Sequence, residues 1–259
     1  LHLCDRRQRQ MCIRDRCNAV IESLENNDIP GLDEDLKTRF LAESLFIRAH
    51  YFYHLVQQFG DIPMPLKPTN SVETTAHKTK VDEVWNQIVT DLEFAVENLP
   101  ETYQASEFGH ITKYAAMHHL SRVYLTLKRS DDDLKKALNY AEQVINSGKY
   151  SLVKSHAELW DINNKNNSEV LFSVLYTQNA ELNGDGNTAH MYFCSAYSEE
   201  HPAVKRVIEY GRPWSRERSS DFAISLFDKT KDQRWDDCFI SRWNVTENSV
   251  TENVFSPFT

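Results

Sequence analysis

Glycine is so rare in this chain that most of its length must fold without it. Only seven of the 259 residues are glycine, and the stretches 32–59, 61–108 and 110–147 contain none. Phosphate-binding loops, dinucleotide-binding turns and turn-rich β-sandwiches need glycine where φ is positive or where the backbone approaches a ligand. We therefore exclude those folds and expect long helices joined by short turns.

Apolar residues recur at three- and four-residue spacing within the glycine-free stretches, which is typical of amphipathic helices. The spacing predicts a first helix from the cap region Asp33–Asp35 to Phe59, ended by Gly60 and the prolines that follow. Further helices are predicted at about 81–99, 112–128, 131–147 and 220–227. Small residues on the two helices that flank residue 130 indicate a close antiparallel pair, as in tetratricopeptide (TPR) repeats.

The 131–147 helix is expected to turn its apolar residues, Leu138 and Ile145 among them, toward the preceding helix. After Gly148 the pattern changes: segments 149–152 and 170–176 are β-type or extended. From Asn183 onward we expect long irregular connections, and loops of that length usually carry function.

Charge and hydropathy exclude two classes of partner. The formal net charge is −9 with both signs interspersed, whereas nucleic-acid binding needs clustered lysine and arginine. No uninterrupted apolar run approaches the ~20 residues of a membrane-spanning helix.

Beyond residue 17 the cysteines are Cys194 and Cys238, without CxxC spacing, so neither a zinc site nor a disulfide framework is indicated.

Residues 1–17 differ from the rest of the chain. They carry five arginines and three of the five cysteines. The run Met11–Arg16 resembles a translation of the transposon mosaic end used in sequencing libraries. We therefore expect residues 1–17 to be a sequencing or assembly artefact, to be set aside in reasoning about function.

Several blocks, in order, resemble one family. Arg39–Ala49 followed by Leu55–Pro63 is similar to the first signature of the SusD/RagB family. Later blocks are similar in the same order, at residues 84–100, 112–127, 144–152, 167–173 and 226–239. The resemblance thus covers residues 18 to about 240.

This resemblance implies a mainly α fold, a TPR-like α/α superhelix with an irregular ligand-binding part. It implies a non-catalytic lipoprotein of the outer membrane, at the cell surface, which binds glycans or other nutrients and delivers them to a SusC-type TonB-dependent transporter, without a cofactor. Family members are considerably longer, so we expect a fragment that lacks its N-terminal lipid and C-terminal region. The expected layout is a helical scaffold at 18–150 and a loop-rich, truncated ligand-binding region at 151–259.

Sugar binding needs flat aromatic faces with amide, carboxylate or guanidinium groups nearby. The loop-rich part contains both kinds of residue. The ligand-binding candidates are Trp214, Arg212, Tyr192, Tyr197, Trp243 and Asn187, and Trp235 belongs to the same aromatic set. Trp85 and Trp160 are expected to pack inside instead, the first on a helix face and the second at an element edge.

Metal binding is the alternative for the histidines. His50 and His54 have the i, i+4 spacing of a two-histidine site, but no HExxH glutamate or third ligand accompanies them. The adjacent His118 and His119 should point in different directions on a helix. The segment Asn183–Asn187 reads as a turn because it lacks the ligand spacing of a calcium loop. We expect no metal and no cofactor.

Two other functions stay open. A helical-repeat scaffold could hold a protein or peptide partner on its concave surface. An enzyme using paired carboxylates on an α/α scaffold is the third reading, since the separation of such carboxylates cannot be read from sequence. No GxSxG nucleophile motif is present.

Overall fold

The computed structural model describes residues 6–26, 29–71, 75, 77–176, 192 and 219–238. Two compact units divide the chain: residues 1–150 with 171–173, and residues 151–170 with 174–259. The mainly α class is confirmed over the described residues, where the β pairing amounts to one isolated bridge between Ile62 and Thr79. None of the described helices combines the length and apolarity that crossing a bilayer requires.

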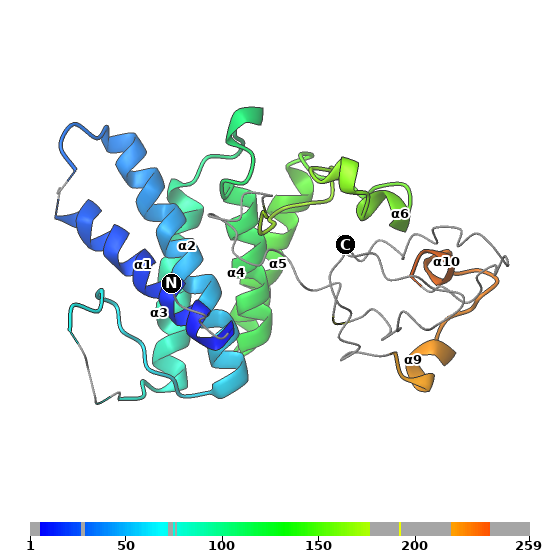
Figure 1. Ribbon diagram of the computed structural model, residues 1–259, viewed down its shortest axis with the longest axis horizontal. Helices are drawn as coiled ribbons and strands as arrows, with labels where there is room; N and C mark the ends of the chain where they lie inside the picture. Colours follow the sequence, from blue (N-terminus) through cyan, green and yellow to red (C-terminus); the bar gives the residue numbers. More distant parts are fainter. Residues whose placement is uncertain are drawn as a thin grey trace, which may run out of the picture. The chain divides into compact units, whose positions relative to one another are not determined.

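Long helices make up the first unit, and each packs on the next one in the chain (Figure 1). Their bounds are α1 Arg6–Glu25, α2 Glu34–Phe59, α3 Val81–Asn98, α4 Lys113–Leu127 and α5 Asp131–Asn146, with a 3₁₀ turn η1 at Ala105–Glu107. The closest packing joins α1 to α2, α2 to α3, α3 to α4 and α4 to α5. This order is that of stacked helical hairpins.

Local capping chemistry sets the helix ends. The Asp33 carboxylate accepts hydrogen bonds from the Asp35 and Leu36 amides at the start of α2, and Ser130 caps α5 in the same way. Gly60 ends α2 with φ of 64°. Lys128 ends α4 at φ of 43°, a left-handed backbone conformation that residues other than glycine rarely adopt.

The core of the first unit lies between α2, α3 and α4. Its fully buried side chains include Phe46, Phe52, Ile88 and Leu120. Trp85 is only 8% exposed, which confirms its expected packing role.

A buried ion pair crosses this core. Arg48 donates from Nε and Nη2 to the two oxygens of Asp91, both at 2.8 Å. Asn18 accepts from Arg48 and Gln87 donates to Asp91, so both charged groups are further hydrogen-bonded. Such a pair is tolerated in a core only because its polar atoms find partners.

Helix α1 is tied to the proline-rich segment that follows α2. Asn18 donates to the carbonyls of Pro65 at 2.9 Å and Lys67 at 3.2 Å, and Arg14 donates to the carbonyl of Pro63 at 3.2 Å. Cys17 is buried against α2 in a small second cluster. Although α1 begins within the segment 1–17, the origin of that segment stays a prediction.

The prediction that the apolar residues of α5 face the preceding helix is wrong for two of them. Leu138 is 59% exposed and Ile145 is 74% exposed, whereas Ala137 and Val144 are buried. Of the described helices, α4 is the long helix packed on α5, and a helix packed on one side buries one narrow stripe. Ala137 and Val144 occupy that stripe, and the residues that follow them point about 100° away.

Short elements make up the described part of the second unit. They are α6 His156–Leu159, the 3₁₀ turn η2 Ile162–Asn164, α9 Asp221–Ser225 and α10 Arg234–Cys238. Helix α9 starts where the sequence predicts, after the cap residue Ser220, but ends two residues earlier than expected. The segments 149–152 and 170–176 have no regular secondary structure in the described part of the chain and join no strand ladder there.

Candidate functional site

Most of the predicted ligand-binding residues lie outside the described residues. This applies to Trp214, Arg212, Tyr197, Trp243 and Asn187. Tyr192 is described and is half-buried in a helical conformation. The roles of all six in ligand binding stay predictions.

The second unit contains a hollow with a volume of about 570 Å³. It is lined by residues 152–156, Leu159, Glu169 and residues 231–234. These two stretches lie far apart in the sequence and meet where α6 packs on α10. The lining combines carboxylates, amines, a guanidinium, an amide and an imidazole.

Side chains bonded to the main chain hold the first wall of this hollow. Asn167 is buried and donates from Nδ2 to the carbonyls of Leu159 and Asn164. Glu169 accepts from the amide of Val153 through Oε2 at 3.1 Å. These bonds fix the course of an irregular segment that has no ladder to support it.

The second wall centres on a carboxylate and guanidinium pair. Asp232 accepts from Arg234 Nε at 2.8 Å and from Nη2 at 2.6 Å. The hydrogen bond from Arg234 lowers the pKa of Asp232, and the same bond raises the pKa of Arg234. The pair therefore stays charged at neutral pH and gives the hollow fixed donors and acceptors.

Trp160 stands at the edge of this hollow, and the expectation that it packs inside is wrong. Its side chain is 48% exposed. Trp160 Nε1 donates to His156 Nε2 at 3.0 Å, and His156 lines the hollow. Because Nε2 accepts, a neutral His156 carries its proton on Nδ1, which lies 3.6 Å from the Asp237 carboxylate. The hydrogen bond thus holds the indole in one orientation, with about half of the residue exposed to solvent.

The ring of Trp235 is less available for stacking than that of Trp160. Lys229 Nζ lies 4.1 Å from the centroid of its ring, and the ring of Phe227 lies 6.0 Å from it. The ammonium occupies the indole face in a cation–π contact. Of the two described tryptophans in this unit, Trp160 therefore presents the better platform.

Sequence reasoning missed Trp160 because its exposure depends on a hydrogen bond to a residue one helical turn earlier. The i, i+4 spacing of His156 and Trp160 was the available signal. For metals, no group of three His, Cys, Asp or Glu that could hold an ion occurs among the described residues.

The sequence of this chain is similar to a protein family and to curated relatives. A family model described as "Starch-binding associating with outer membrane" matches residues 13–125. The SusD-like protein P2 of Formosa agariphila is 30% identical over 200 residues, which cover 75% of this chain and 37% of that protein. The chain spans about a third of the length of the curated relatives it matches.

Solved structures of SusD-like proteins also resemble this chain. A laminarin-binding SusD-like protein superposes with a TM-score of 0.57 at 29% identity, covering 66% of this chain and 37% of that one. A structure solved with xylogluco-oligosaccharide superposes with a TM-score of 0.59 at 25% identity, covering 65% of this chain and 34% of that one. By sequence and by helical architecture, the chain is a member of the SusD/RagB family with a TPR-like helical fold.

Proposed function

We propose that this chain belongs to a protein that binds glycans at the cell surface and catalyses no reaction on them. The observation that carries the proposal is the likeness to a laminarin-binding SusD-like protein, at 29% identity over 66% of this chain. The relative solved with xylogluco-oligosaccharide supports the same class of ligand.

The geometry of the second unit supports this class of ligand. A pyranose ring presents axial C–H bonds to an aromatic face, and its hydroxyls need paired donors and acceptors close by. The half-exposed Trp160 follows Leu159, which lines a hollow whose walls also carry Glu169, Gln233 and Arg234. Trp214 and Arg212 are proposed as further ligand-binding residues.

Delivery is the second part of the proposal. We infer that the bound glycan passes to a SusC-type TonB-dependent transporter, and that the protein is lipid-anchored at the outer membrane. The family description, which names association with the outer membrane, supports this location.

Isothermal titration calorimetry of the full chain with laminarin and xyloglucan oligosaccharides tests the proposal. Removing a stacking indole should weaken binding by about 1 to 3 kcal/mol, so Trp160→Ala should lose roughly 5- to 150-fold in affinity. Phe222→Ala is the matched control, because Phe222 is 72% exposed in the same unit and lies on α9, which contributes no residue to the lining of the hollow. Trp214→Ala in the same series tests the sequence-based candidate.

Two outcomes would contradict the proposal. If the wild-type chain binds no glycan but captures a protein partner tightly, the helical-repeat scaffold is the better function. The exposed Leu138 and Ile145 on α5 favour that second candidate, because apolar side chains at i, i+7 form a stripe on which a partner helix could pack. Release of shortened glycan on long incubation would instead indicate an enzyme.

A further inference from the structure

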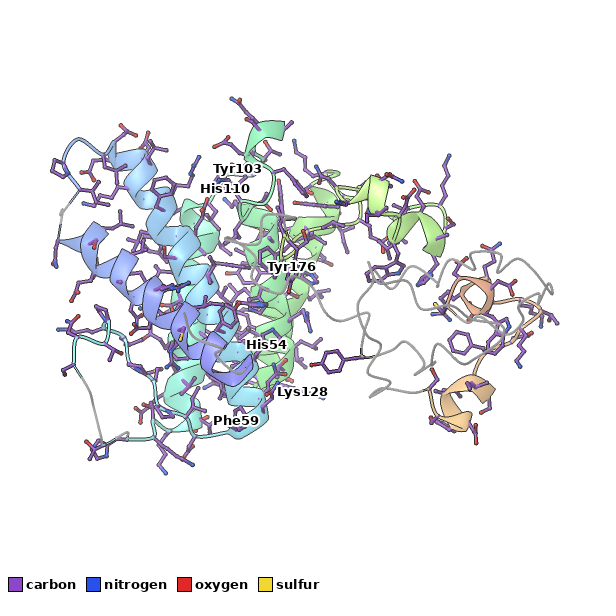
Figure 2. All side chains as sticks on the ribbon, viewed as in Figure 1. His54, Phe59, Tyr103, His110, Lys128 and Tyr176 are labelled. Carbon is purple, nitrogen blue, oxygen red and sulfur yellow. The ribbon has the colours of Figure 1, made fainter. Side chains whose placement is uncertain are left out.

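Three imidazole rings, those of His50, His54 and His119, meet where α2 contacts α4 in the first unit, and the exposed His118 precedes His119 on α4. His50 and His54 come from α2, and His118 and His119 come from α4. The ring centroids of His50 and His54 are 4.6 Å apart, and those of His50 and His119 are 5.2 Å apart. Figure 2 labels His54, on the α2 side of this group. Nothing in the proposed glycan surface uses these residues.

One nitrogen of the innermost ring, that of His119, lacks a hydrogen-bond partner in the described structure. His119 is 6% exposed, and its Nε2 is buried with no partner in the described structure. Tyr53 and Phe46 pack on this ring at 4.9 and 5.6 Å between centroids, and their aromatic faces do not satisfy a ring nitrogen. Buried polar atoms are nearly always paired, so this nitrogen is an unused hydrogen-bonding group within the histidine cluster.

Arg122 supplies a positive charge beside the rings. It is exposed on α4 one turn after His118, and no carboxylate pairs with it within the described ranges. Its guanidinium lies 5.9 Å from the centroid of the Tyr53 ring. By contrast, Arg48 and Arg234 are each bound by a carboxylate.

The charged groups that act on the four rings are the other rings and Arg122. Burial is the largest cause that lowers the pKa of each imidazole, and Arg122 lowers each of them further. The segment 171–173, which also packs on the group, contributes the uncharged Phe172. The site is therefore positive in a chain of net charge −9.

This charge decides which ligand fits. A divalent metal would be repelled by Arg122, and the rings do not form a three-ligand group in the described structure. An oxyanion is attracted by the same charge and can accept N–H donors from neutral imidazoles and from the guanidinium fork. We propose that Arg122, His118 and His54 bind a carboxylate or sulfate group, of the kind that acidic saccharides carry, with His50 and His119 as the buried layer behind them.

The proposal goes beyond glycan binding at the second unit and does not depend on it. The full chain is titrated with sodium sulfate, galacturonate and, as the neutral match, galactose, at constant ionic strength in chloride. Calorimetry and the NMR signals of the histidine rings report binding. Sulfate and galacturonate should shift the ring signals, and galactose should not. A preference for galacturonate over sulfate identifies an acidic saccharide as the source of the oxyanion, and equal binding supports recognition of the oxyanion group alone.

Matched variants locate the site. Arg122→Gln should weaken binding of both anions at least tenfold, and His118→Gln should weaken it less, because it removes a donor and leaves the charge. Arg129→Gln is the control, since Arg129 is also exposed, follows α4, and its guanidinium donates to the neutral amide oxygen of Asn86. Equal losses in the two arginine variants would overturn the proposal, as would ring signals that ignore both anions. Saturable binding of zinc that shifts His50 and His119 would overturn it in favour of a metal site.

Discussion

Lowering the pH from 7 to 5 should destabilise the first unit through His50 and His119. Burial lowers the pKa of His50 to about 4 and that of His119 to about 3, whereas a solvated histidine titrates near pH 6.5. Between those values the unfolded chain binds protons that the folded chain does not. The stability that these residues contribute is therefore complete above about pH 6.5 and is lost as the pH falls toward the folded-state pKa values.

The size of the effect follows from the same numbers. At pH 5 each residue lies about 1.5 pH units below its unfolded pKa and still above its folded pKa, and each unit corresponds to about 1.4 kcal/mol. His50 and His119 should therefore each remove about 2 kcal/mol from the free energy of unfolding, or roughly 4 kcal/mol together. This is a large part of the 5 to 15 kcal/mol that is typical of a folded protein.

Urea unfolding followed by far-ultraviolet circular dichroism measures this loss at pH 7 and pH 5, in chloride buffers of equal ionic strength. His119→Gln should reduce the drop between the two pH values by about 2 kcal/mol, and the double variant with His50→Gln should remove most of it. His77→Gln, at an exposed position, should leave the drop unchanged. A wild-type stability that is equal at both pH values, or an undiminished drop in the double variant, would refute the reasoning.

Two further predictions concern the frame of the first unit. Asp91→Asn leaves Arg48 buried without its counter-charge and should cost about 3 to 5 kcal/mol in urea unfolding. Asp132→Asn breaks an exposed pair and should cost less than about 0.5 kcal/mol, so similar losses would contradict the role given to burial. Lys128→Gly relieves the left-handed residue at the end of α4 and should raise the free energy of unfolding by about 1 kcal/mol, and an unchanged urea midpoint would show that this position carries no strain.

Helix positions were predictable because their signals are local. The predicted bounds of α2 to α5 agree with the structure to within two residues, since apolar spacing and the caps at Asp33 and Ser130 act over one or two turns. The same spacing could not show which apolar residues find a neighbour. Leu138 and Ile145 have the right period but lie outside the stripe that α4 covers.

The sites depend on contacts between distant segments, and sequence reasoning found them only in part. That His118 and His119 point in different directions is confirmed, because one is exposed and the other buried. That His119 meets His50 follows from the packing of α2 and α4, which no local pattern encodes. The domain boundaries and the ligand roles assigned at residues 187–243 stay predictions.

The contacts between α1 and the proline-rich segment have a consequence for sequence variation. Asn18 and Arg14 donate their hydrogen bonds there to main-chain carbonyls, which every residue type provides. The side chains between Pro63 and Lys67 can therefore be exchanged without loss of these hydrogen bonds, provided that the backbone keeps its course. In comparisons among relatives, we expect position 18 to vary less than the segment that it holds.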